Sequence, residues 1–180
     1  MAMFCRECGS RMSPVHMDGR VRAVCGNCGY IDYQNWKVSA GVRVVINNSV
    51  LLVKRGHEPW RGKWHMPAGY VEIDEEPVRA AEREAFEETG FVVKAEKLVD
   101  CYLDTEDPRG NVIVLLYDAR IIDGKPATSA ETESIGFFTA DKRNGHRFAL
   151  DTGFVNSFLD ALGDLKRIGH GSFAIQHHNT

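Results

Sequence analysis

The sequence of 180 residues contains no long apolar run and no strong excess of one sign of charge. No segment approaches the roughly 20 apolar residues that a membrane span requires, and the N-terminus lacks the apolar centre of a secretory signal. Its 25 acidic and 22 basic residues leave a net charge of -3, which argues against a disordered acidic tail or a strongly basic nucleic-acid binder. We therefore expect a cytoplasmic protein of one domain with a small addition, because the length exceeds a typical domain of about 150 residues only slightly.

The five cysteines are distributed unevenly along the chain. In a reducing compartment, two Cys-x-x-Cys pairs are more readily metal ligands than disulfides, and the spacing between them lies within the range of four-thiolate zinc sites. A redox-active or incidental pair is the alternative. We predict a structural zinc site and expect the fifth cysteine, Cys101, to be a small buried apolar residue of a strand; the predicted zinc ligands are Cys5, Cys8, Cys25 and Cys28.

Residues 1–36 are poor in apolar runs and cannot form a hydrophobic core of their own, so a bound zinc ion would replace it. We predict a zinc ribbon over residues 1–36 and a second domain over residues 37–180. Five basic and three acidic residues precede residue 38, and four thiolates with Zn²⁺ bring this charge close to zero. This near-neutral charge argues against nucleic acid as a partner.

The rest of the chain alternates strand and helix patterns. Apolar residues at every second position predict a strand over residues 37–46, and a turn then leads into a second strand over 50–53. Pro77 and Gly90 are typical of the start and the end of a helix, with acidic residues ahead of Pro77 that suit the positive end of its dipole. Further strands are predicted near 92–99, 101–103, 111–122 and 134–139, and a second helix over 151–167. This pattern predicts an α+β fold with a mixed sheet.

The predicted first helix and the residues just before it are strongly acidic. Eight acidic and two basic residues lie between Glu72 and Glu88. On a helix, Glu84, Glu87 and Glu88 fall within an arc of about 100°. Carboxylate oxygens are preferred ligands of Mg²⁺ and Mn²⁺, which also bridge to phosphates. A solvated acidic face is the alternative to this predicted cation site.

Gly69, Glu75 and residues 83–91 follow the spacing G-x5-E-x7-R-E-A-F-E-E-T-G-F. This segment resembles the Nudix box at every fixed position, and the similarity extends over roughly residues 37–167. The resemblance implies an α/β/α sandwich with a mixed sheet. It also implies an enzyme in which water attacks a phosphorus of a nucleoside diphosphate linked to another group, while metal ions neutralise the developing charge.

The resemblance assigns roles to residues of the box. Glu84 and Glu88 are expected to be the principal Mg²⁺ or Mn²⁺ ligands, and Glu87 is expected to be a third ligand or to hold metal-bound water. The backbone carbonyl near Ala68 or Gly69 commonly completes such a site in this family. Glu75 and Arg83 are expected to pair with each other and to hold the loop.

Other site residues are open to alternatives. The general base lies either in the box or in a downstream loop, where Glu131 and Glu133 are the candidates. Arg55 and Lys63 are candidate partners of the diphosphate, with solvated surface charge as the alternative. Trp60 and Tyr70 are candidates for stacking on a base or a flavin ring, with loop packing as the alternative.

A zinc ribbon followed by a Nudix domain resembles two groups, the NADH pyrophosphatases and a smaller group similar to ADP-ribose and FAD pyrophosphatases. Only Pro108 and Pro126 follow the box, so the Ser-Gln-Pro-Trp-Pro-Phe-Pro element of the NADH enzymes is absent. We therefore favour Mg²⁺-dependent hydrolysis of ADP-ribose, FAD or a related dinucleotide with release of AMP. The alternatives are an NADH pyrophosphatase, a nucleoside triphosphate sanitising hydrolase and a non-catalytic regulator that binds a nucleotide or nucleic acid. The resemblance also implies a homodimer.

Overall fold

The computed structural model describes residues 4–47, 49–105 and 107–139. Its contacts divide the chain into two compact units, Met1–Trp36 and Lys37–Thr180. Each unit has its own cluster of buried side chains. Within the described part of the chain, no helix is long and apolar enough to cross a membrane. The helix predicted over residues 151–167 lies outside the described residues.

The first unit is a small antiparallel sheet with two equivalent cysteine loops. Its strands are β1 (Met12–Met17), β2 (Arg20–Cys25) and β3 (Ile31–Asp32), paired in that order. In one loop the N–H of Gly9 donates to the Cys5 carbonyl at 2.8 Å, and in the other Gly29 donates to Cys25 at 2.9 Å. Both glycines have a φ above 70°, a conformation that glycine adopts without strain. Each loop thereby turns one Cys-x-x-Cys pair back on itself.

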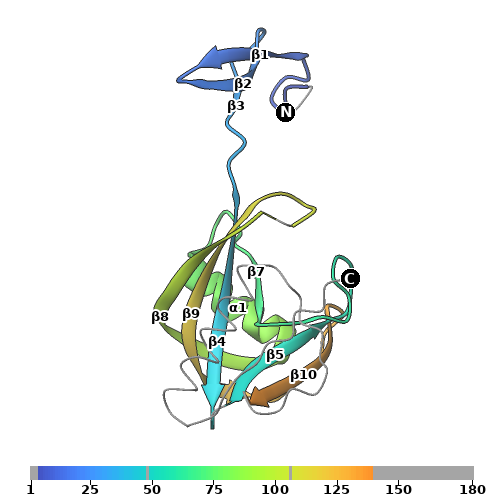
Figure 1. The fold of residues 1–180 in the computed structure, drawn as a ribbon, viewed down its shortest axis with the longest axis vertical. Coiled ribbons are helices and arrows are strands. Elements are labelled where there is room, and N and C mark those ends of the chain that lie inside the picture. Colours follow the sequence, from blue (N-terminus) through green and yellow to red (C-terminus); the bar gives the residue numbers. More distant parts are fainter. Residues whose placement is uncertain (1–3, 48, 106, 140–180) are drawn as a thin grey trace, which may run out of the picture. The chain divides into compact units, whose positions relative to one another are not determined.

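The second unit is built on a mixed sheet whose main path is β10-β5-β4-β9-β8 (Figure 1). Strands β4 and β9 run parallel, whereas the other neighbours on this path are antiparallel. The short strands β6 and β7 pair with β5 and β4. One helix, α1, belongs to the described part of this unit, so the predicted α+β class with a mixed sheet is confirmed. The bounds are β4 (Lys37–Ile46), β5 (Ser49–Arg55), β6 (Trp64–His65), β7 (Ala68–Tyr70), α1 (Pro77–Thr89), β8 (Phe91–Asp104), β9 (Val112–Gly124) and β10 (Thr132–Thr139).

Strand β8 differs from the sequence prediction. The two strands expected near residues 92–99 and 101–103 form one strand of 14 residues, whose register against β9 shifts at three places. Such bulges insert an extra residue and change which side chains face the core. Tyr102 packs against a buried cluster, so its neighbour Cys101 faces the other way and is exposed. The prediction that Cys101 is buried is therefore wrong.

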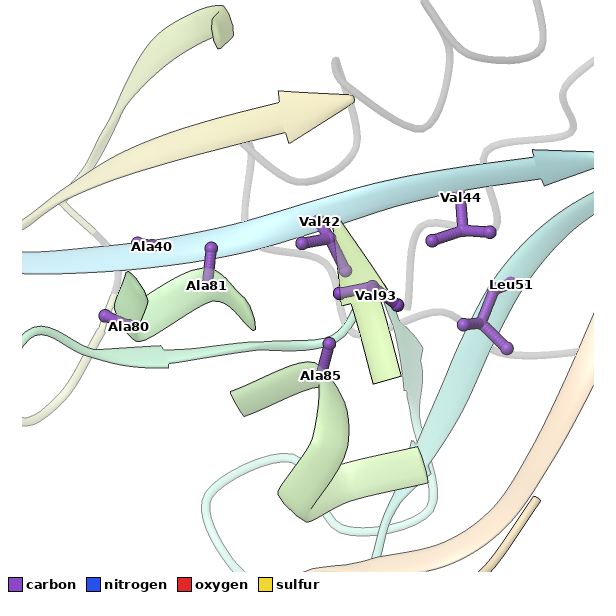
Figure 2. Close-up of a cluster of buried hydrophobic side chains, with 8 residues drawn as sticks. All are labelled: Ala40, Val42, Val44, Leu51, Ala80, Ala81, Ala85 and Val93. Carbon is purple, nitrogen blue, oxygen red and sulfur yellow. The ribbon is translucent and has the colours of Figure 1, made fainter. Parts of the chain in front are cut away.

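Helix α1 packs against the sheet through alanines. Its N-cap is Glu76, whose side chain makes no capping hydrogen bond, and it ends at Gly90, whose N–H donates to the Phe86 carbonyl at 2.8 Å. The first turn contains no acidic residue. Figure 2 shows three alanines of α1 in one buried cluster with residues of β4, β5 and β8. Because these side chains are small, the helix lies close to β4, which fixes the position of its acidic side; the cluster contains Ala40, Val42, Val44, Leu51, Ala80, Ala81, Ala85 and Val93.

Strand β5 is buried on both faces. Leu51 belongs to the cluster beneath α1, whereas Val50 and Leu52 belong to a second cluster with Trp64, Met66 and Leu116. The rings of Trp64 and Phe138 meet edge to face, with their centroids 4.6 Å apart. This packing anchors β5 and the loop that follows it, and that loop carries several side chains of the site described below.

Candidate active site

One cavity of the second unit, about 400 Å³ in volume, gathers most of the predicted site residues. This volume lies within the range of about 300–1,000 Å³ that is typical of small-molecule sites. Its lining comes from the box helix, β7 and the residues between β7 and the helix, the end of β5 with the loop that follows it, the neighbouring ends of β8 and β9, and the segment before β10. The charged and aromatic side chains of the lining are Arg55, His57, Trp60, His65, Tyr70, Glu72, Arg83, Glu84, Glu87, Glu88, Asp104, Asp107, Arg109 and Glu131.

The carboxylates of α1 meet in this cavity. Glu88 is only 5% exposed, and its Oε2 accepts the N–H of Ala68 at 3.0 Å. Burial raises the pKa of Glu88 to about 8, and the nearby Glu84 adds to this effect. Burial likewise raises the pKa of Glu84. Glu87 lines the same cavity and is more exposed, so the three carboxylates predicted from the box share one wall.

Gly69 allows a carboxylate to approach the backbone of β7. A Cβ atom on this residue would overlap the carboxylate of Glu84, so any other residue would displace that side chain. The carbonyl of Gly69 accepts the Ser39 hydroxyl at 2.7 Å, and Gly69 lines the cavity. The loop backbone and Glu84 therefore lie against each other at the cavity.

Arg83 connects the acidic side chains of the box. Its guanidinium donates to both carboxylate oxygens of Glu75, at 2.6 and 3.1 Å, and to Glu84 and Glu87 at 2.8 and 2.9 Å. It also donates to the Tyr70 carbonyl at 3.1 Å. The hydrogen bonds to Glu75 are the main reason that the pKa of Arg83 is raised. This one cation offsets part of the negative charge and ties the loop to the helix.

The donor set suits a hard divalent cation. Carboxylates and a backbone carbonyl are oxygen ligands of the kind that Mg²⁺ and Mn²⁺ prefer, and here they border a single cavity. Burial is the main cause of the raised pKa of both Glu84 and Glu88, and a bound cation would favour their charged forms. The residues that would hold such an ion are Glu84, Glu87, Glu88 and the carbonyl of Gly69.

The structure places three of the four predicted substrate contacts at the cavity. Arg55, Trp60 and Tyr70 line the cavity, whereas Lys63 is not part of its lining. Arg55 forms a hydrogen bond with the Nε2 atom of His57 at 2.8 Å. Burial lowers the pKa of Arg55, and the charge of Arg109 contributes to this effect. The guanidinium groups of Arg55 and Arg109 therefore line the same cavity.

The two candidate bases downstream of the box differ in position. Glu131 lines the cavity, and its carbonyl accepts the N–H of Gly56 at 2.8 Å, next to Arg55. Glu133 pairs with Lys54 at 2.9 Å instead and lies outside the lining. Only Glu131 is thus placed near the carboxylates of α1.

Three charged residues at the β8–β9 end of the cavity were not predicted as site residues. Asp104 lies at the end of β8, and Asp107 and Arg109 follow it in the connection to β9. The sequence shows only a turn signal around Pro108 and Gly110. The register of β8 against β9, which brings these residues to the cavity, involves pairing across the sheet and is not encoded in a local motif.

The four cysteines of the first unit form a cluster that fits zinc. All are free thiols, and their sulfur atoms lie within 4.8 Å of one another. The pairs Cys5–Cys28 and Cys8–Cys25 have sulfur atoms 3.6 and 3.5 Å apart. A tetrahedral site with Zn–S bonds of about 2.3 Å separates its sulfurs by about 3.8 Å. The cluster therefore has the composition and size of a four-thiolate zinc site.

Comparison with known proteins agrees with both parts. Residues 36–150 match the NUDIX domain family, and residues 3–34 match the Nudix N-terminal zinc ribbon family. The chain belongs to the Nudix hydrolases. The resemblance identified from the box and the cysteine pairs is thus confirmed, and with it the assignment to an enzyme family.

Three relatives illustrate the family. This Nudix chain is 34% identical over 106 residues to an ADP-ribose pyrophosphatase of Methanocaldococcus jannaschii, covering 58% of the chain and 62% of that protein. It is 36% identical over 93 residues to the NAD-capped RNA hydrolase NudC of Haemophilus influenzae, covering 51% of the chain and 34% of NudC. A crystal structure of a NUDIX hydrolase from Nitrosomonas europaea covers 96% of this chain and 97% of its own, with a TM-score of 0.78 and 28% identity. The chain thus spans less than two thirds of the first two relatives.

Proposed function

We propose that this Nudix domain hydrolyses the diphosphate bond of a nucleoside diphosphate derivative and releases AMP. ADP-ribose is the leading substrate, and FAD or a related dinucleotide is next. The observation that carries the proposal is the convergence of Glu84, Glu87 and Glu88 with the half-buried Arg55 in one cavity. Negative groups that can hold cations lie there beside a positive group that can hold a phosphate.

The side chains of this cavity have distinct proposed roles. Glu84 and Glu88, assisted by Glu87 and the carbonyl of Gly69, would hold Mg²⁺ or Mn²⁺. When bound, such an ion neutralises phosphate charge and lowers the pKa of a bound water. Arg55 donates to the diphosphate, and Glu131 accepts the proton of the attacking water. Glu131 is preferred over Glu133 as the base because it lines the cavity.

The choice of ADP-ribose has two supports. One relative with 34% identity is named an ADP-ribose pyrophosphatase, and the proline-rich element of NADH pyrophosphatases is absent from the chain. NudC, named for hydrolysis of NAD-capped RNA, is similar over half of the chain. NADH therefore belongs in the panel of substrates to be tested.

The test is a set of incubations with Mg²⁺ and ADP-ribose, FAD, NADH or oxidised dGTP, followed by separation of the products. We expect AMP and ribose 5-phosphate from ADP-ribose at the highest kcat/KM. Preferred turnover of oxidised dGTP would instead indicate a sanitising hydrolase. The absence of turnover with every diphosphate would contradict the proposal and favour a regulator that binds nucleotides without hydrolysis.

We also propose that the cysteine cluster holds one structural zinc ion and that the protein is a homodimer, as its resemblance implies. A filled four-thiolate site has no open position for catalysis, so zinc is expected to stabilise the first unit. The mass in solution, measured with and without zinc chelation, tests whether the ribbon supports the dimer.

A further inference from the structure

The connection between β8 and β9 carries a tightly held ion pair at the cavity. Arg109 donates from Nε and Nη2 to the two oxygens of Asp107, at 2.9 and 2.6 Å. The N–H of Arg109 adds a third hydrogen bond to the same carboxylate at 2.7 Å. The N–H of Asp107 donates to Asp104 at 3.1 Å, and Lys37 donates to the carbonyl of Arg109 at 2.9 Å. Hydrogen bonds to the backbone of both residues thus hold the ion pair in place.

Arg109 also covers the aromatic residues that were expected to stack on substrate. Its guanidinium lies 5.3 Å from the ring centroid of Tyr70 and 6.0 Å from that of Trp60. The ammonium of Lys37 lies 5.3 Å from the Tyr70 ring. Cation–π contacts at these distances are favourable. This wall of the cavity therefore presents a guanidinium group held on two rings, in addition to the rings themselves.

Two features of this wall are unusual for a segment that only packs. The hydroxyl oxygen of Tyr70 is buried and has no hydrogen-bond partner among the described residues, although buried hydroxyls ordinarily have one. Trp60 has a φ of 65°, a conformation that is rare for a bulky residue and concentrates at functional sites. Both residues line the cavity.

The charge of the wall is the property that matters for selection. Asp107 cancels the charge of Arg109, and only Arg109 is accessible, because the Asp107 side chain is 3% exposed and that of Arg109 is 40% exposed. Arg109 uses Nε and Nη2 on Asp107, which leaves Nη1 without a hydrogen bond to Asp107. A neutral ion pair with an exposed guanidinium suits alcohol groups and adds no net positive charge for a further phosphate.

We propose that the Asp107–Arg109 pair determines substrate specificity, a step that rests on the function proposed above. The pair admits a nucleoside diphosphate joined to an uncharged, hydroxyl-bearing group such as a pentose. It disfavours a nucleoside triphosphate, whose additional charge gains nothing from a neutral wall. Arg109 is a specificity residue in this scheme, and Asp107 positions it and sets its effective charge.

A charge series at these two positions tests the proposal. Asp107→Asn makes the wall positive, Arg109→Gln makes it negative, and the double variant makes it neutral again. The measured quantity is the ratio of kcat/KM for ADP-ribose to kcat/KM for ATP, both with Mg²⁺. We expect the ratio to fall about tenfold in Asp107→Asn and to rise in Arg109→Gln, since one unit charge near a phosphate has an effect of this size. The double variant returns to within about threefold of the original ratio.

The ion pair between Glu96 and Arg120, 2.7 Å apart on β8 and β9 and outside the cavity lining, provides the matched control. Glu96→Gln, Arg120→Gln and their double variant make the same chemical changes and leave the ratio unchanged. If the ratio stays constant through the Asp107 and Arg109 series while both rates fall together, the pair is only structural and the proposal is overturned.

Binding separates this proposal from the proposed function. In a Glu88→Gln background with Mg²⁺, calorimetry gives the Kd values of ADP-ribose and ATP for each member of the series. If the unmodified protein hydrolyses neither compound, the proposed function is contradicted. Opposite shifts of the Kd ratio in Asp107→Asn and Arg109→Gln would still support the role of the ion pair in specificity. A Kd ratio that does not change across the series contradicts it whether or not hydrolysis occurs.

Discussion

Among single residues, Gly69 shows how a motif position acquires a physical reason. Gly69 belongs to the Nudix box, and the resemblance implies that its carbonyl is a ligand of the metal. The structure adds that a side chain at this position would overlap the carboxylate of Glu84. The glycine is therefore needed for close approach as well as for its carbonyl, which no spacing rule could reveal.

Gly69→Ala is expected to displace Glu84 and to weaken binding of Mg²⁺. We expect the Mg²⁺ concentration for half-maximal activity to rise about tenfold or more, the size of effect seen when a ligand loses its orientation. Gly26→Ala is the control, because a Cβ there meets no atom within 4 Å. An unchanged Mg²⁺ requirement in Gly69→Ala would contradict the close-approach argument.

His65 provides a prediction on pH and stability. Burial lowers its pKa to about 4, while its Nδ1 donates to the Met66 carbonyl at 2.8 Å. The unfolded chain takes up this proton near pH 6.5 and the folded chain only near pH 4. The stabilisation is thus present above pH 6.5 and is lost as the pH falls towards 4.

Urea unfolding at several pH values between 7.5 and 4 measures this effect. His65→Asn keeps a donor near the Met66 carbonyl and removes the titration, so its free energy of unfolding is expected to fall less on acidification than that of the unmodified protein. His16→Asn, at an exposed position of β1, is the control. Parallel pH curves for His65→Asn and the unmodified protein would show that His65 makes no such contribution.

Other single residues were beyond local inference. Glu131 and Glu133 are equally good candidates for the base from the sequence. The pairing of β10 with β5 determines which of them lies at the cavity. Cys101 was expected to be buried because its neighbours read as a strand, yet a bulge alters the alternation. Asp107 and Arg109 resembled an ordinary turn. Each depends on contacts between residues far apart in the chain.

At the level of elements, the helix was more predictable than the long strands. Pro77 and Gly90 marked the helix, and α1 spans Pro77–Thr89, because capping is a local property. Strand β8 was predicted as two pieces because its bulges depend on the partner strand. The hairpin near residues 46–50 was visible because a turn and alternating residues lie next to each other, and β4 and β5 pair there.

The alanines of α1 make a testable contribution to packing. Ala81 is fully buried against the cluster on β4, so Ala81→Leu has no space for its side chain. Overpacking of this kind costs about 1–3 kcal/mol, and displacement of the helix would also lower kcat. Phe86→Leu, at an exposed position of the same helix, is the control. Thermal unfolding and kcat measured together check this, and an unchanged melting temperature in Ala81→Leu would contradict it.

In the whole molecule, the two units are stabilised in different ways. The second unit has two apolar clusters around its sheet, whereas the first has a small cluster that includes two of the cysteines. The sequence indicated this contrast because apolar runs begin only after residue 36. Because this core is small, the first unit is expected to need a bound zinc ion for its stability.

Zinc analysis tests this difference. We expect one zinc ion per chain by elemental analysis, and we expect Cys28→Ser to lose it together with the ordered structure of residues 4–36. Cys101→Ser is the control, because Cys101 is exposed and lies outside the cluster. Retention of a full equivalent of zinc by Cys28→Ser would contradict the assignment.

The most direct test of the central claim is the turnover of ADP-ribose by Glu88→Gln with Mg²⁺. The buried carboxylate of Glu88 lies at the proposed metal site, so kcat is expected to fall by roughly two to three orders of magnitude, the loss typical of one preorganised electrostatic group. Thermal stability is expected to be retained, since burial already favours the protonated form of Glu88. Glu96→Gln should keep the original rate. A Glu88→Gln variant that releases AMP at the unmodified rate would contradict the account.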